Sequence, residues 1–336
     1  MLAEATPTAA QQLAQVWKFQ AHPEVWVIMV GIIAAYVYMV RVIGPEAVPD
    51  GPAVTKKQLT CFVAGMLVFW SASDWPIHDL AENYLYSVHM VQHLMMSYFL
   101  APLFLLAIPE WMARTLIGNG RAYRTMRFLS GPITAGVIFN AYVMITHIPG
   151  VVNASVGNAL LHYGLHSVLV ITSLIAFMPI CGPIPEWHLK PAGKMIYLFL
   201  ESVVPTVPAA WLTFAEGTVY KRYNVPVRVW GMTVAEDQQA AGGIMKLGGS
   251  VYLWTIIGVI FFRHFIRGQA REMKRVAHLR PGGQGIPRVT CCRRAGRAAI
   301  RRLITPSGRT GPQQRASQAP RQQARSTQDR GGLLLR

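Results

Sequence analysis

Charged residues are scarce in this chain of 336 residues, and their scarcity excludes an ordinary soluble protein. They make up 14% of the sequence, whereas hydrophobic residues make up 52%. A soluble globular domain carries roughly 25% charged residues. The basic excess is also confined to one end, because sixteen Arg and one Lys follow residue 266 against only Glu272 and Asp329. The net charge of +17 therefore describes a basic tail, and the rest of the chain is nearly neutral.

Cysteines and enzyme motifs are also few. The four cysteines (Cys61, Cys181, Cys291 and Cys292) show no CxxC spacing and no framework typical of a secreted disulfide-rich domain. We assign no role to the Cys291–Cys292 pair. The sequence contains no CxxCH, Walker A or GxSxG motif. The N-terminus lacks the pattern of a cleaved signal peptide, so we expect the first apolar segment to remain as a membrane span.

Long apolar stretches are the main feature that the sequence does have. A membrane helix needs about 20 mainly apolar residues, because each backbone polar group in the bilayer must be hydrogen-bonded within the protein. Seven stretches qualify: Val25–Ile43, Leu59–Trp75, Tyr84–Ile108, Pro132–Ile148, Val156–Ile180, Met195–Phe214 and Gly242–Phe265. Pro205 and Pro208 predict a kink in the sixth. We predict an all-α polytopic membrane protein with about seven transmembrane helices.

Lysine and arginine predict its orientation, because they are enriched in cytoplasmic loops. Alternate loops and the tail carry them. The residues in these loops are Arg41, Lys56, Lys57, Arg114, Arg121, Arg124, Arg127, Lys190 and Lys194. The two–three and four–five loops have none, and only the six–seven loop (Lys221, Arg222 and Arg228) blurs the pattern. This places the N-terminus outside and the C-terminus in the cytoplasm.

Three regions follow from this topology. Residues 1–24 form an extracytoplasmic segment, 25–266 the seven-helix domain, and 267–336 an Arg-rich disordered cytoplasmic tail. The tail has too few large apolar residues to fold alone. No aromatic residues interleave its arginines, so we expect contact with membrane lipids rather than with nucleic acid.

Histidines mark the candidate site. His89 and His93 begin the third span, His147 closes the fourth, and His162 and His166 begin the fifth, all at the outer side. The spacing i, i+4 within each pair puts both imidazoles on one helix face, where they can share a metal ion. A single histidine near a membrane interface usually serves packing or hydrogen bonding. Two pairs and a fifth histidine at one depth favour a metal site, because ionisable groups in a membrane are costly and usually functional.

Neighbouring side chains refine the choice of metal. Imidazole suits copper, zinc, iron and nickel, whereas thioether sulfur favours Cu(I). Met90 lies between two of the histidines, and Met95, Met96, Met144 and Met245 lie in the same spans, although such methionines are also common in packing.

Asp79 and Asp237 are the acidic residues expected to reach the site, where either would orient an imidazole. For Asp79, a helix-start role beside the third span is an equal alternative. Lys246 is expected to extend to the membrane surface or to pair with Asp237.

The residues leave several functions open. One is a non-enzymatic copper-handling protein. A membrane-embedded zinc hydrolase would need three ligands and an activated water, but five histidines exceed that need. A copper transport or resistance permease would need a polar path inward, and the inner halves of spans three, five and seven offer none. All five histidines share one depth, which argues against a diheme electron carrier.

Four segments resemble the CtaG family of caa3-type cytochrome c oxidase assembly factors. The first is SVHMVQHLMM at residues 87–96, continuing to APLFLLAIP at 101–109. The other three segments occur in the same order as in the family: Thr146–Pro149, Leu161–His166 and Asp237–Met245. The resemblance covers about residues 20–266. The Arg-rich tail is not a feature of that family. Where the family often has an acidic residue before the second histidine of span five, this chain has Leu165.

The resemblance implies a bacterial inner-membrane protein needed to assemble haem–copper oxidase, with a proposed role in copper delivery. It implies His89, His93, His147, His162 and His166 as candidate ligands of Cu(I), with Asp237 and Gln238 nearby. Subunit I or II of cytochrome c oxidase is the expected partner. We therefore predict an assembly factor, not an enzyme, that holds Cu(I) near the outer membrane face.

Replacing His89 and His93 together by alanine should abolish stable metal binding and leave membrane insertion intact. The reason is that both imidazoles of one helix face are lost while the span stays apolar. Metal content of the detergent-purified protein measures the first effect and membrane fractionation the second. Unchanged metal content would remove this pair from the site.

Overall fold

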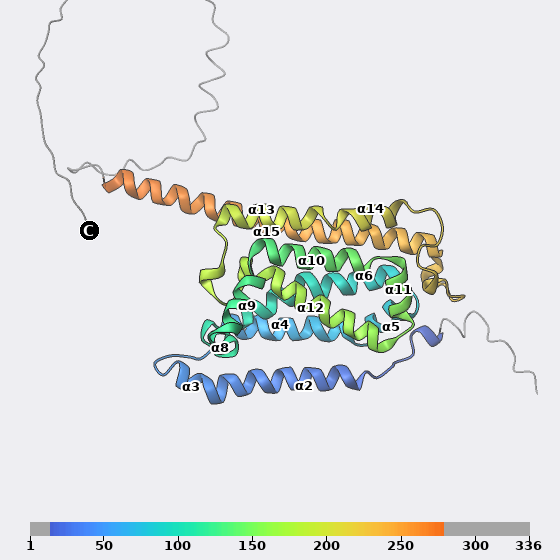
Figure 1. Ribbon diagram of the computed structural model, residues 1–336, viewed down its shortest axis with the longest axis horizontal. Coiled ribbons are helices and arrows are strands. Elements are labelled where there is room, and N and C mark those ends of the chain that lie inside the picture. The colour runs from blue at the N-terminus through green and yellow to red at the C-terminus, as the bar shows by residue number, and fades with distance from the viewer. Residues whose placement is uncertain (1–13, 279–336) are drawn as a thin grey trace, which may run out of the picture. The chain divides into compact units, whose positions relative to one another are not determined.

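A computed structural model describes residues 14–278, and every regular element in that range is helical (Figure 1). The helices are α2 (Pro23–Tyr38), α3 (Gly44–Ala47), α4 (Lys56–Ser73), α5 (Ile77–Asn83), α6 (Tyr86–Leu94), α7 (Ala101–Ala107), α8 (Glu110–Ile117), α9 (Arg121–Leu129), α10 (Pro132–Thr146), α11 (Pro149–Val156), α12 (Ala159–Cys181), α13 (Pro191–Val203), α14 (Thr206–Phe214) and α15 (Val234–His278). The predicted all-α class is confirmed for this range.

Five helical segments are long and apolar enough to cross a membrane: Pro23–Ala47, Tyr86–Ala107, Ala159–Cys181, Pro191–Phe214 and Val234–Arg275. A sixth arises if α9 and α10, bent by 68° at their junction, count as one span. Two of the seven predicted spans fall on elements outside the five. α4 begins with Lys56, Lys57 and Gln58, which reduce its apolar character, and α10 has only 15 residues. The chain is thus a membrane protein with five or six candidate spans on length and composition.

The third predicted span is the centre of the bundle. A π turn, Met95–Leu100, joins α6 to α7 without interrupting the helix. This turn and α7 contact α4 on one side and α12 on the other, and α10 packs against α12. Large apolar side chains on the outside, such as Ile133 and Phe214, are exposed in the isolated chain. The hydrocarbon of a bilayer would cover them.

The sixth predicted span is interrupted at the place where the prolines predicted a kink. α13 ends at Val203 and α14 begins at Thr206, with Pro205 at the break. The Nζ of Lys246 donates to the Ser202 carbonyl (3.1 Å) and to Thr206 Oγ1 (2.5 Å). Lys246 therefore does not pair with Asp237 but stabilises a backbone carbonyl near the break, as polar side chains do where proline interrupts a membrane helix.

α15 is longer than its predicted apolar segment at both ends. It begins at Val234 because Thr233 and Glu236 form reciprocal hydrogen bonds that satisfy its first backbone donors. It continues to His278, so residues 267–278, predicted as disordered tail, are helical. Extending an existing helix avoids the nucleation penalty, and Ala, Arg, Glu, Met and Lys are good helix formers. The rest of the predicted tail, with Cys291 and Cys292, lies outside the described residues.

Glycines allow α15 to approach its neighbours. A Cβ on Gly242 would meet the Ala209 carbonyl oxygen of α14 at 2.6 Å, and one on Gly248 would meet Leu94 of α6 at 2.7 Å. By contrast, a Cβ on Gly243 would meet nothing within 4 Å. α15 is therefore positioned closely against α6 and α14 by particular glycines.

This contrast gives a matched pair of variants. Gly242→Ala should lower the free energy of unfolding by about 1–3 kcal/mol, because the added methyl overpacks a backbone contact. Gly243→Ala should be neutral or stabilising by up to about 1 kcal/mol, since alanine has the higher helix propensity. Thermal unfolding in detergent measures both. Equal effects of the two substitutions would contradict the close approach at Gly242.

Candidate metal site

The site is built on the first turn of α6, whose position is fixed by Asp237 of α15. Its carboxylate accepts hydrogen bonds from the backbone N–H groups of Tyr86 (2.7 Å) and Ser87 (3.0 Å). A carboxylate is favourable at a helix N-terminus, where backbone donors have no partner within the helix. The prediction that Asp237 orients an imidazole is therefore wrong, because both its oxygens are directed to the backbone of α6. It acts on His89 and His93 through the helix that carries them.

Gln238, the next residue, organises the connection between α14 and α15. Its Oε1 accepts from the N–H groups of Val219 (2.9 Å) and Tyr220 (3.1 Å), and its Nε2 donates to the Tyr220 carbonyl (3.0 Å). The Tyr220 hydroxyl in turn donates to the His147 carbonyl (2.9 Å). Gln238 is thus near the site, as expected, through the loop that contacts His147 and not as a ligand.

The five predicted histidines converge at one end of the bundle. One ligand nitrogen from each of His89, His93 and His166 lies within 4.8 Å of the other two, so these three could hold one metal ion. The His162 ring centre is 4.2 Å from that of His166, and the His147 ring centre is 6.3 Å from that of His93. Helices α6, α10 and α12 therefore bring all five together, with three at the centre and two at the margins.

The central distances fit a metal. His93 Nε2 and His166 Nε2 are 3.2 Å apart. Two nitrogens about 2.0–2.1 Å from one tetrahedral ion would be about 3.3 Å apart. The Nδ1 of His89 is buried with no hydrogen-bond partner, as expected for an atom that has a ligand when the site is loaded. The chemistry of this group is that of neutral imidazoles, which bind copper or zinc.

His147 has the tautomer that a ligand needs. Its Nδ1 donates to the Val143 carbonyl (2.7 Å), so in the neutral ring Nε2 carries the lone pair. That Nε2 is buried and has no hydrogen-bond partner. A backbone carbonyl on one ring nitrogen is the usual way in which a metal-binding histidine is oriented.

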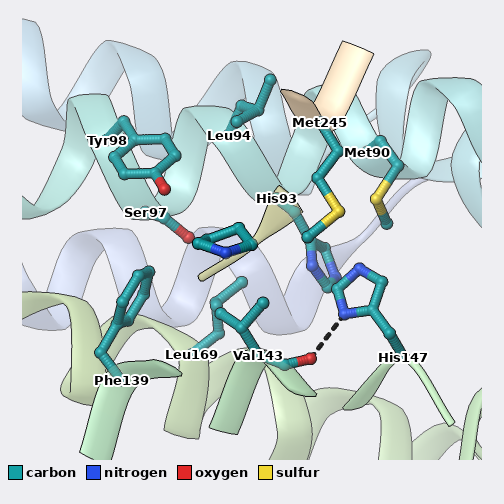
Figure 2. Close-up of a pocket in the computed structure, with 11 residues that line it drawn as sticks. Met90, His93, Leu94, Ser97, Tyr98, Phe139, Val143, His147, Leu169 and Met245 are labelled. Atoms are coloured by element: carbon teal, nitrogen blue, oxygen red, sulfur yellow. Dashed lines mark hydrogen bonds between the residues drawn. The ribbon is translucent and has the colours of Figure 1, made fainter. Parts of the chain in front are cut away.

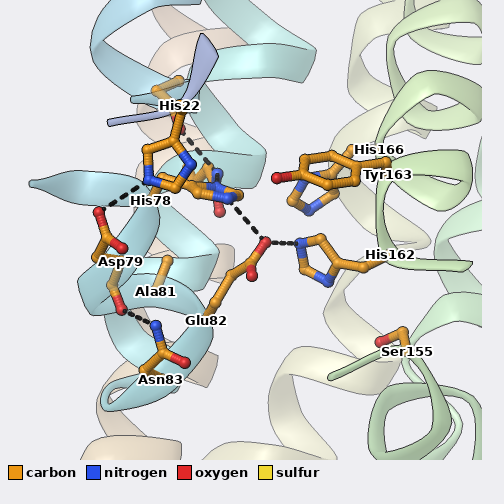
Figure 3. A network of polar contacts seen from close by, with 12 residues as sticks. His22, His78, Asp79, Ala81, Glu82, Asn83, Ser155, His162, Tyr163 and His166 are labelled. Atoms are coloured by element: carbon orange, nitrogen blue, oxygen red, sulfur yellow. Dashed lines mark hydrogen bonds and ion pairs between the residues drawn. The ribbon is translucent and has the colours of Figure 1, made fainter. Parts of the chain in front are cut away.

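A polar network from α5 adjoins the cluster, and the sequence reasoning did not place it in the site (Figure 3). Glu82 Oε1 lies 2.7 Å from His162 Nε2 and 3.0 Å from His78 Nε2. Asp79 does accept from an imidazole, but that imidazole is His22 (Nε2–Oδ2 3.1 Å), not one of the five. The i, i+4 spacing of His78 and Glu82 was the available signal for this network.

The charges of this network follow from its contacts. Burial lowers the pKa of His78. Gln92 donates to its Nδ1 (3.2 Å), so the neutral ring carries its proton on Nε2, facing Glu82. Burial would raise the pKa of Glu82, but the hydrogen bond from His162 and the nearby imidazoles outweigh it and lower that pKa. For His22, hydrogen bonds to Asp79 and Glu24 outweigh burial and raise the pKa. An ionised Glu82 therefore lies beside the histidine cluster.

Comparison with known proteins agrees with these observations. The family model of the cytochrome c oxidase caa3 assembly factor, Caa3_CtaG, matches residues 16–266. The chain belongs to this family. Neither a comparison with curated proteins nor one with solved structures found a match. The match spans every helix that contributes a residue to the site, and it confirms the resemblance on which the role in oxidase assembly was predicted.

Glu82 also bears on one of the two departures that we noted from the pattern of the caa3 assembly factors. Leu165 stands beside His166 where an acidic residue is common. In this chain a carboxylate reaches the neighbouring His162 from α5 instead. The cluster therefore has an acidic neighbour supplied by another helix.

Asp237→Asn tests whether this carboxylate positions the site. Loss of the charged acceptor should lower the free energy of unfolding by about 1.5–3 kcal/mol, the usual range for hydrogen bonds to charged groups. Glu236→Gln is the matched control, because glutamine can keep the reciprocal bonds to exposed Thr233, and we expect a change within about 0.5 kcal/mol. Thermal unfolding in detergent compares them, and equal stability of the two variants would contradict this role.

Proposed function

We propose that this caa3 assembly factor holds Cu(I) in the histidine cluster and delivers it to a subunit of haem–copper oxidase, subunit I or II. The observation that carries the proposal is the approach of ligand nitrogens from His89, His93 and His166 within 4.8 Å of one another, inside a membrane protein of an oxidase-assembly family. The buried Nδ1 of His89, which has no hydrogen-bond partner, is suited to binding an ion. Neutral, exchangeable ligands also allow its release.

The proposal includes an orientation. Lys and Arg in alternate loops support an N-terminus outside and a C-terminus in the cytoplasm of a bacterial inner membrane. In this arrangement α4 and α10 cross the membrane beside the five longer helices, giving seven spans. The histidine cluster then lies near the outer face, together with the loop between α14 and α15. We propose that this face receives the ion and meets the oxidase.

The functional test uses a strain that lacks this protein and measures the copper content and activity of its oxidase. The wild-type chain should restore both. His166→Ala should lower oxidase copper by roughly tenfold or more, the loss typical of disturbed metal surroundings. Its matched control is His264→Ala, an exposed histidine in α15 that should complement fully.

Added copper separates delivery from other roles in assembly. Partial rescue of the His166→Ala strain by excess copper in the medium is the expected result, because mass action can replace a lost affinity. Full oxidase copper in the His166→Ala strain without added copper would refute delivery through this cluster.

A further inference from the structure

A second cavity adjoins the histidine cluster deeper in the bundle, and its lining differs in chemistry (Figure 2). It measures about 40 Å³, and its lining includes Met90, His93, Ser97, His147 and Met245 together with apolar side chains. The neighbouring cavity on the cluster side is lined by His89, His93, His162 and His166 with tyrosine, serine and threonine residues. His93 lines both cavities. One imidazole therefore separates a histidine-rich space from one that contains two thioethers.

The deeper cavity has a free ligand atom. His147 Nε2, buried and without a hydrogen-bond partner, belongs to a ring that lines this cavity and is absent from the lining of the other. Figure 2 shows the sulfur atoms of Met90 and Met245 turned toward the imidazoles of His93 and His147. Two sulfurs and a lone pair from three different helices thus point into one small space.

The two methionines are held in place by the packing already described. Met90 precedes His93 by one turn of α6 and is 2% exposed. Met245 lies on α15 between Gly242 and Gly248, the glycines that let α15 approach α14 and α6. Flexible methionines fill irregular gaps in many cores. Here they come from separate helices and line the same small cavity as a ring whose Nε2 has no hydrogen-bond partner, which packing alone does not require.

We propose that Met90, Met245 and His147 form a second metal site, selective for Cu(I), which adjoins the three-histidine group through His93. The proposal rests on the proposed function in that copper is the cargo. Thioether sulfur is a soft ligand that selects Cu(I). All these ligands are neutral and the remaining lining is mostly apolar, so the site favours a monovalent ion, since the Born cost of burying a dication is about four times larger. The three-histidine group has no thioether among its ligands and does not select in this way.

The adjoining sites give the ion a route that needs no release to water. A copper ion held by His89, His93 and His166 can exchange His89 and His166 for the methionines and His147 while His93 stays bound. No bond other than metal–ligand bonds changes, and no electron is transferred. Zn(II) and Cu(II) can occupy the first group but are disfavoured in the second, so the pair of sites discriminates between metals.

The test compares Cu(I) and Zn(II) binding to the full chain in detergent. X-ray absorption of the Cu(I)-loaded wild type should show sulfur as well as nitrogen ligands. Met90→Leu with Met245→Leu keeps the side-chain volume and should remove the sulfur signal and lower Cu(I) affinity roughly tenfold. Zn(II) affinity should stay unchanged, which a misfolded variant would not show. Met144→Leu, on a methionine outside this lining, is the matched control and should retain the sulfur signal.

The outcomes distinguish this site from the proposed function. Copper bound by nitrogen alone, or a sulfur signal that survives the double substitution, overturns the thioether site and leaves the histidine cluster intact. Sulfur-bound copper that depends on Met90 and Met245 supports the site even if the complementation experiment shows normal oxidase copper in the His166→Ala strain. Absence of copper from the loaded wild type overturns both proposals.

Discussion

The capping of α6 by the Asp237 carboxylate is the interaction on which the site depends most. In a bilayer the free N–H groups at a helix start need a partner from the protein, and Asp237 supplies it to Tyr86 and Ser87 from a helix 150 residues away in sequence. Its neighbour Gln238 fixes the loop whose Tyr220 holds the His147 carbonyl. Two adjacent side chains on α15 therefore set the positions of α6 and of the end of α10. The histidines on both helices are oriented as a result.

The polar groups at this end of the bundle fall into three adjoining sets that differ in hardness. Asp79 and Glu82 on α5 are carboxylates and contact His22, His78 and His162. A second set contains the three imidazoles of the central group, and a third contains the thioethers of Met90 and Met245 with His147. The softest of these ligands, the thioethers, match the soft monovalent ion that we propose as the cargo.

The sequence predicted the convergence of the five histidines because periodicity and depth fix where a residue lies along a membrane helix. It also predicted an irregularity near Pro205, where the helix is interrupted. The sequence did not predict that His78 and Glu82 contact the cluster. Whether their side chains point toward it depends on how the short helix α5 is oriented between two spans. The role of Asp237 was misread for a related reason. The sequence does not show which backbone N–H groups lack a partner. From sequence alone, an aspartate that caps a distant helix therefore cannot be told from one that orients an imidazole.

The π turn at Met95–Leu100 divides the central helix into two halves, α6 and α7, that are rotated relative to each other about the helix axis. A π turn adds one residue to the helical repeat, and each residue of an α-helix accounts for about 100° of rotation. Relative to an uninterrupted α-helix, α7 is therefore turned by roughly that angle about the common axis. Before the turn, His89 and His93 face α12 and α10. Beyond it, Ala101 and Leu105 belong to an apolar cluster with other residues of α12 and with residues of α13 and α15. Deleting one residue from this turn would rotate one half of the helix relative to the other. It would shorten the span only slightly.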